Sequence, residues 1–184
     1  PRLHYEDYKA GSAKLDTCME LVHGALDGGH RILLFSQFTG MLDIISKRLA
    51  KEDIAFLKLT GASSKESRAK MVAQFQAGEV PVFLISLKAG GVGLNLTAAD
   101  VVIHYDPWWN VAAQDQATDR AHRIGQQHTV TVYKLIAKDT IEERIMQMQE
   151  SKRDLVNSVL GGDGISSALF TREDVLALLG GDGR

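Results

Sequence analysis

The sequence lacks the groups that several classes of protein depend on. Its 184 residues include a single cysteine, Cys18, so the chain forms no internal disulfide. No apolar run approaches the ~20 residues that a helix needs to span a membrane. The net charge is −2, which is not the strongly basic signature of a free-standing DNA-binding domain. Any contact with DNA must therefore be local or shared with another domain.

Two short motifs of nucleotide hydrolases are also missing. The chain contains no Gly-Lys dipeptide, which excludes a Walker A phosphate loop, and no Asp-Glu dipeptide, which excludes the acidic box that holds a magnesium ion. Its six histidines are scattered without the spacing of metal ligands, so we expect no metal site. The chain starts at Pro1 rather than Met, and we expect it to be part of a longer protein.

The sequence does contain a regular alternation of strand and helix patterns. Short apolar runs bounded by turn residues predict strands over residues 31–35, 56–59, 82–86, 101–104 and 129–137. Helical apolar spacing fills the segments between most of them. This alternation predicts an α/β fold, with a mostly parallel sheet and helices on both faces. Ligands of such sheets bind at the carboxyl ends of the strands, so we expect the functional site there.

Several predicted helices carry capping residues at their starts. Ser12 is expected to cap the first helix, and Ser63 with Glu66 has the spacing of a capping box for the helix after the second strand. Thr140 with Glu143 has the same spacing. The apolar stripe that follows this pair predicts a long helix, which forms a carboxy-terminal helical extension of the α/β fold.

The most specific stretch runs from Ser86 to Gln126. It begins with a glycine loop, where the lack of side chains lets a ligand approach the main chain closely. Gln116, Arg120 and Arg123 follow at spacings of four and three, which places them on one face of a helix. Two guanidiniums and an amide near a glycine loop suit a polyphosphate. A solvated helix face, with ion pairs to neighbouring aspartates, explains the same spacing equally well.

The same stretch resembles conserved motifs of helicase superfamily two, specifically of the Swi/Snf-type DNA-dependent ATPases. Residues 86–96 resemble the fifth motif of that family, and residues 116–126 resemble the sixth. The strand at 31–35 with the following Ser36 and Gln37 is similar to the fourth motif, although both side chains could simply cap the next helix. The resemblance covers most of the chain. It implies a RecA-like fold, with the carboxy-terminal helicase lobe at residues 1–138 and a helical brace and tail at 139–184.

The resemblance implies a function that needs two lobes. ATP and Mg²⁺ are held mainly by an amino-terminal RecA-like lobe of the same protein, and the lobe in this chain closes on them. The implied catalytic residues are the arginine fingers Arg120 and Arg123, and the implied nucleotide-binding residues are Gln116, Gly91, Gly93 and Asn95. The implied contacts to double-stranded DNA are Gln37, Thr60, Lys88 and Trp109. Since such contacts grip the phosphate backbone, we expect translocation on DNA without sequence preference, coupled to remodelling of DNA–protein complexes.

Some features depart from the family pattern or leave alternatives open. Val111 stands where the family usually has proline, and Lys134 where it often has arginine. Trp109 fits packing under a helix as well as insertion into a DNA groove, and Trp108 favours packing. For the whole chain, the alternatives are an ATP-inactive interaction domain with the same fold and a small methyltransferase with its own glycine loop. The expected location is cytoplasmic and nucleoid-associated in a bacterium or archaeon, and nuclear in a eukaryote.

Overall fold

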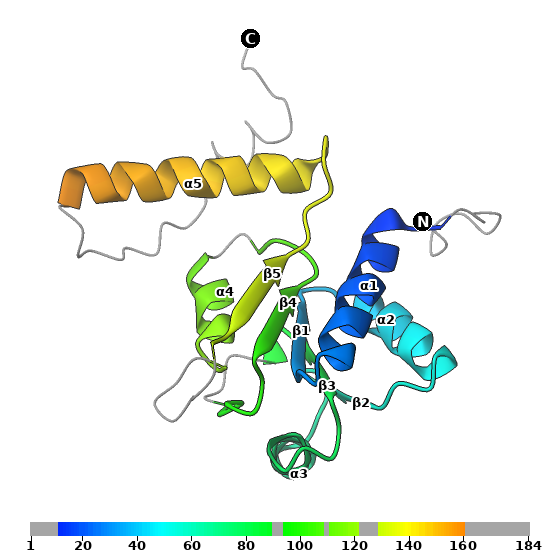
Figure 1. The fold of residues 1–184 in the computed structure, drawn as a ribbon. Helices are drawn as coiled ribbons and strands as arrows, with labels where there is room; N and C mark the ends of the chain where they lie inside the picture. Colours follow the sequence, from blue (N-terminus) through cyan, green and yellow to red (C-terminus); the bar gives the residue numbers. More distant parts are fainter. Residues whose placement is uncertain (1–10, 90–93, 109–110, 122–128, 161–184) are drawn as a thin grey trace.

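The computed structural model describes residues 11–89, 94–108, 111–121 and 129–160. Within these residues, the centre of the fold is a five-stranded sheet of order β2-β3-β1-β4-β5, in which every neighbouring pair is parallel (Figure 1). The strands are β1 (Ile32–Ser36), β2 (Phe56–Leu59), β3 (Val82–Ser86), β4 (Val101–His104) and β5 (Thr131–Lys134). The predicted parallel α/β sheet is confirmed, and β2, β3 and β4 have the predicted bounds.

Two pairs of helices cover the two faces of the sheet. On one face, α1 (Ala13–Asp27) and α2 (Thr39–Lys51) bury Val22 and Ile45 against Leu34 of β1. On the other face, α3 (Lys65–Gln76) and α4 (Val111–Thr118) bury Phe75 and Ala117 in a second cluster. Successive side chains of a strand point to opposite faces, so the central strands contribute to both clusters. The result is the predicted arrangement of helix, sheet and helix layers.

Burial differs sharply between the central strands and one edge. All five residues of β1 and all five of β3 are buried, as expected for parallel strands covered by helices on both faces. All four residues of β5 are exposed. The sequence predicted a longer strand here, at 129–137. The structure shortens it because β5 pairs only with the four residues of β4, from Val101↔Thr131 to His104↔Lys134.

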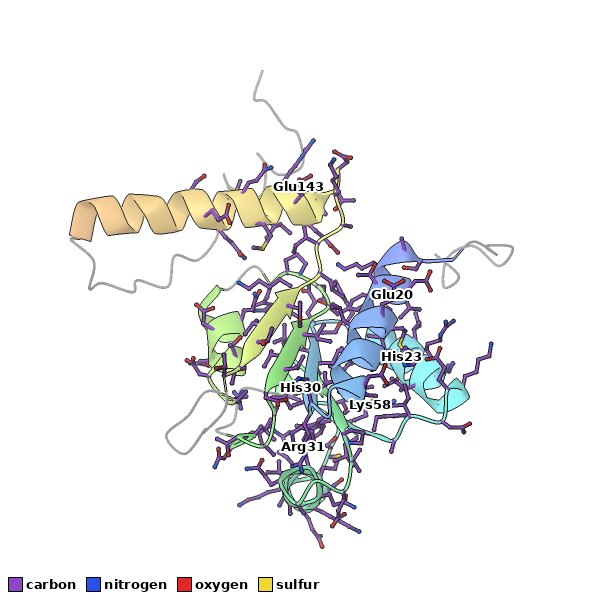
Figure 2. All side chains as sticks on the ribbon, viewed as in Figure 1. Glu20, His23, His30, Arg31, Lys58 and Glu143 are labelled. Carbon is purple, nitrogen blue, oxygen red and sulfur yellow. The ribbon has the colours of Figure 1, made fainter. Side chains whose placement is uncertain are left out.

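A long helix, α5 (Ile141–Leu160), follows β5 and crosses beyond the carboxyl end of the sheet (Figure 1). Figure 2 shows Glu143 at its start, and Glu20 and His23 along α1. The Glu142 carboxylate accepts a hydrogen bond from the Ala137 N–H at 2.8 Å and forms an ion pair with Lys14 of α1. This helix is the predicted carboxy-terminal extension, and the remaining tail lies outside the described residues.

The helix starts agree with the predicted caps in part. Ser12 caps α1, because its hydroxyl accepts a hydrogen bond from the Leu15 N–H at 3.3 Å. The capping box at Ser63 is wrong by one residue: Ser64 caps α3 by accepting from the Ser67 N–H at 3.1 Å. The hydroxyl of Ser63 is already used, since it accepts from the Thr60 N–H at 3.2 Å in the preceding turn.

At the start of α5 the predicted capping pair is present with shifted partners. The Thr140 hydroxyl accepts from the Glu142 N–H at 3.2 Å, and the Glu143 carboxylate accepts from the Asp139 N–H at 2.9 Å. Each bond is one position away from the reciprocal Thr140–Glu143 box. Asp139 has a positive φ of 58°.

Candidate functional site

The carboxyl ends of four neighbouring strands bring predicted DNA-contact segments into one row. Thr60 directly follows β2, Lys88 lies just after β3, Gln37 directly follows β1, and Trp108 lies in the segment after β4. Because the strand order is β2-β3-β1-β4, these segments succeed one another along a single sheet edge. Neighbouring strands lie ~4.8 Å apart, so the row spans about 14 Å. Arg31, before β1, marks the opposite edge (Figure 2).

A buried carboxylate, Asp106, joins the ends of β1 and β4. The Ser36 hydroxyl donates to Asp106 Oδ2 at 2.6 Å, and the Gln37 N–H donates to Oδ1 at 3.0 Å. The Gln37 side-chain amide donates to the Pro107 carbonyl at 3.1 Å. Asp106 is only 4% exposed, and burial raises the pKa of its carboxyl, while the bonds from Ser36 and Gln37 oppose that rise. Gln37 and the segment that begins at Asp106 are therefore held as one unit.

Little in the sequence indicates this role for Asp106. The sequence leaves open only that Ser36 and Gln37 cap the helix that follows β1, which is α2. In the structure the N-cap of α2 is Phe38, with no side-chain cap bond, so the capping alternative is wrong. The available signal was an acidic residue two positions after the end of a buried apolar strand, where a carboxylate needs hydrogen-bond partners.

The amino flank of the glycine loop is held by an arginine of α3. The Arg68 guanidinium donates to the Ala89 carbonyl at 2.9 Å. Lys88, directly before Ala89, is exposed at the sheet edge. Gly91 and Gly93, the predicted nucleotide-binding glycines, lie outside the described residues. Arg68 thus anchors the start of the loop.

The carboxyl flank of the glycine loop lies against the Arg120 segment. The Leu96 N–H donates to the Arg120 carbonyl at 3.1 Å, and Asn95 beside it is exposed. α4 ends two residues before Arg120, whose side chain is 5% exposed, whereas Gln116 within the helix is exposed. The predicted common helical face is therefore wrong for this pair, because the chain leaves the helix between them. Arg123 lies outside the described residues.

Of the two neighbouring tryptophans after β4, the structure describes Trp108 but not Trp109. Trp108 is half-buried and packs against the cluster beneath α3 and α4, which confirms the predicted packing. Trp109 lies outside the described residues. Thr60, at the other end of the row, is half-buried, and its N–H is engaged by Ser63.

A second buried polar group, His104, connects the end of β4 to α4. Its Nε2 lies 3.0 Å from the Thr118 hydroxyl, and its ring stacks on Phe35 with centroids 5.4 Å apart. The side chain is 1% exposed, and burial, with a smaller contribution from Lys134, lowers its pKa to about 4. The imidazole is therefore neutral in the folded protein at neutral pH.

We expect acid to destabilise the fold through His104. An unfolded histidine binds its proton near pH 6.5, whereas the folded ring binds one only near pH 4, so stability is full above about pH 6.5 and falls as the pH drops to about 4. The difference corresponds to about 3 kcal/mol of unfolding free energy. Urea unfolding at about pH 7.5 and about pH 4 measures it. His104→Gln keeps a polar group facing Thr118 but does not titrate, and it should remove most of this pH dependence. An unchanged dependence in the variant contradicts the expectation.

Two further features are absent from the described part of the chain, a cluster of metal ligands and a membrane-spanning helix. Within it, no three histidine, cysteine, aspartate or glutamate side chains gather closely enough to hold a metal ion. None of the helices in the described ranges combines the length and apolar character that crossing a bilayer requires.

Comparison with known proteins identifies the family of this fold and site. The family model described as "Helicase conserved C-terminal domain" matches residues 13–125, more than half of the chain. The structure is also similar to "Sulfolobus solfataricus SWI2/SNF2 ATPase core in complex with dsDNA", with a TM-score of 0.68 and 40% sequence identity, over 81% of this chain and 31% of that one. This chain is a helicase C-terminal domain of the SWI2/SNF2 family. Its fold is RecA-like, as the resemblance implied.

Relatives of this SWI2/SNF2 domain occur in bacteria and eukaryotes. A Mycoplasma pneumoniae protein named "Uncharacterized ATP-dependent helicase" is 46% identical over 168 residues, which are 91% of this chain and 16% of that protein. "Chromatin-remodeling ATPase INO80" of Cryptococcus neoformans var. neoformans is 46% identical over 165 residues, 89% of this chain and 9% of that protein. The chain thus spans less than a fifth of the length of these relatives.

Proposed function

We propose that this domain is the second motor lobe of a DNA-dependent ATPase that translocates on double-stranded DNA and remodels DNA–protein complexes. The observation that carries the proposal is the contact between the Leu96 N–H and the Arg120 carbonyl, which joins the glycine loop to the arginine segment at one edge of the sheet. The relatives' names, an ATP-dependent helicase and a chromatin-remodeling ATPase, support ATP as the substrate. The solved SWI2/SNF2 core in complex with double-stranded DNA supports the choice of DNA.

The proposed ATP chemistry is shared between two lobes. ATP and Mg²⁺ are held by an amino-terminal lobe with its own Walker A loop, because this chain has neither that loop nor the acidic box. Arg120 and Arg123 supply positive charge to the γ-phosphate when the lobes close, a contribution typically worth ~10³–10⁵ in rate. Gln116, Gly91, Gly93 and Asn95 complete the nucleotide side of the cleft. Residues 1–138 form the lobe, and 139–184 form the brace and tail.

Three of the proposed DNA contacts, Gln37, Thr60 and Lys88, lie in the row of segments at the carboxyl ends of the strands. Gln37, Thr60 and Lys88 meet the phosphate backbone, which carries no sequence information, and Trp109 inserts against a groove, so binding is independent of sequence. The row of about 14 Å equals the axial rise of roughly four nucleotides of one strand, at ~3.4 Å each. A lobe with a net charge of −2 binds weakly by itself, and the other lobe supplies the remaining contacts.

One observation favours a second candidate, an ATP-inactive interaction domain with the same fold. Arg120, one of the two proposed fingers, is 5% exposed and therefore covered by its own lobe. If Arg123 also makes no contact with ATP, the domain keeps the fold without the chemistry. Turnover of the full-length wild-type protein separates the two candidates, because only the motor lobe supports DNA-stimulated ATP hydrolysis.

Replacing Lys88 is expected to weaken DNA binding about equally on unrelated sequences. A lysine that neutralises one phosphate contributes ~0.9 to the slope of log affinity against log salt, so Lys88→Ala should flatten the slope by that amount. The measurement is a fluorescence anisotropy titration of the full-length protein on two unrelated duplexes at several salt concentrations. Lys51→Ala is the matched control, because Lys51 is exposed at the end of α2, next to the opposite sheet edge. A slope that stays the same in Lys88→Ala removes Lys88 from the DNA contact.

A further inference from the structure

Two buried glutamines hold the main chain of Trp108 from opposite sides. The side-chain oxygen of Gln114, on α4, accepts a hydrogen bond from the Trp108 N–H at 3.2 Å. The side-chain amide of Gln149, on α5, donates to the Trp108 carbonyl at 2.6 Å. Gln114 is 2% exposed and Gln149 is 9% exposed. One residue of the edge row thus has both of its backbone polar groups satisfied by side chains from two different helices.

Gln114 belongs to a chain of contacts that reaches the end of β4. The Thr118 hydroxyl, one turn further along α4, donates to the Gln114 carbonyl at 3.3 Å and lies 3.0 Å from His104 Nε2. The helix that carries these residues leads directly into the Arg120 segment, whose carbonyl holds the flank of the glycine loop at Leu96. Gln114 therefore connects Trp108 to the helix that leads into the Arg120 segment.

Gln149 lies on the face of α5 that is fixed to the rest of the lobe. Glu142, Ile145 and Gln149 are spaced three and four apart, so they share one helix face. Glu142 bonds the Ala137 N–H and pairs with Lys14, and Ile145 is buried. A leucine at position 149 would bury a side chain of similar size without burying an amide. Burying an amide that has no partner costs about as much free energy as losing one hydrogen bond. The hydrogen bond from the Gln149 amide to the Trp108 carbonyl offsets this cost.

We propose that Gln114 and Gln149 are positioning residues that couple the arginine segment and α5 to the DNA-contact segment around Trp108. Trp109, the proposed groove contact, is the next residue in the chain. When DNA moves this segment, Gln114 passes the displacement to α4 and the Arg120 turn, and Gln149 fixes the segment against α5. Neither glutamine touches ATP or DNA. The inference rests on the proposed function, because coupling has meaning only if DNA stimulates ATP turnover.

The test is the ratio of DNA-stimulated to DNA-free ATP turnover in the full-length protein. Gln114→Met and Gln149→Met keep the side-chain size but lose the acceptor and the donor, and each should lower the ratio about tenfold, the change that one buried hydrogen bond typically makes. Gln114→Glu keeps an acceptor facing the Trp108 N–H and should restore the ratio. Gln147→Met is the control, because Gln147 is exposed on the same helix. The double Met variant should be little worse than either single one, since both bonds hold the same residue.

Hydrogen exchange of the peptide containing Trp108 gives a second readout that needs no ATPase activity. Exchange should speed up in Gln114→Met, which frees the Trp108 N–H, and stay slow in Gln114→Glu and Gln147→Met. If DNA does not stimulate the wild-type protein but the variants show this exchange pattern, the proposed function is contradicted. The two glutamine bonds to Trp108 are still supported in that case. Unchanged exchange, or an unchanged turnover ratio in properly folded Met variants with normal wild-type stimulation, overturns the coupling role.

Discussion

Replacing Arg123 with alanine in the full-length protein should lower ATP turnover by about 10³-fold or more at saturating DNA. An arginine that reaches the γ-phosphate acts on the charge that develops in the transition state, and such fingers typically contribute ~10³–10⁵ in rate. Affinity for ATP should fall far less than turnover, since the contact is complete only when the lobes close. Steady-state kinetics over a range of ATP concentrations separates the two quantities.

Lysine at position 123 should not restore activity, because a point charge cannot reproduce the two-bond fork of a guanidinium. Arg48→Ala is a matched control: Arg48 is a half-exposed arginine near the end of α2, with Glu52 as its ion-pair partner. Melting temperature should barely change in Arg123→Ala. By contrast, Arg120→Ala should lower it, because the side chain of Arg120 is buried. Near-normal turnover of Arg123→Ala, or its unfolding, would leave Arg120 as the only candidate finger.

The 184-residue chain alone should hydrolyse no ATP, with or without DNA. The reason is chemical: it has no Walker A lysine for the β- and γ-phosphates and no acidic box for the magnesium ion. Phosphate release by the purified chain should stay at background, while the full-length protein under the same conditions turns over.

A contaminating ATPase could imitate activity of the short chain, and a variant distinguishes the two. Any phosphate release by the chain should be measured again with Arg123→Ala. Release that persists unchanged does not depend on Arg123, whereas release that disappears belongs to this chain. The second result, together with stimulation by DNA, would show that the site is complete without the other lobe.

The sheet was predictable because its strands are continuous apolar runs between turn residues. Val82–Ser86 is such a run, and it lies between a proline and the glycine loop, so both its ends are visible in the sequence. The start of α3 was harder. Ser63 and Ser64 are adjacent and chemically equal, and only the extended backbone of Ser64, with φ −63° and ψ 160°, decides which one caps the helix.

The candidate site was predictable in its location but not in its internal contacts. Gln37 and Lys88 follow two neighbouring parallel strands, so the backbone alone places them at the same end of the sheet. The bond from Ser36 to Asp106 joins residues 70 positions apart, and the bond from Gln149 to Trp108 joins residues 41 positions apart. Periodicity reports only on near neighbours in the chain, so it carries no information on such pairs. It also predicted that Gln116 and Arg120 share one helical face. In the structure α4 ends at Thr118, so Gln116 lies in the helix and Arg120 lies beyond it.

The strand order also determines when the lobe can form during its synthesis. β1 is central, yet its partners β3 and β4 begin roughly 50 and 70 residues later in the chain. At ~5–20 residues per second, the ribosome adds the first 50 of these residues in roughly 3–10 s. During that time Ile32–Ser36, five residues that are all buried in the finished fold, has no strand to pair with. A nascent chain of this topology therefore exposes an apolar, aggregation-prone strand early in synthesis. Slow translation lengthens the period in which a chaperone has to bind that strand.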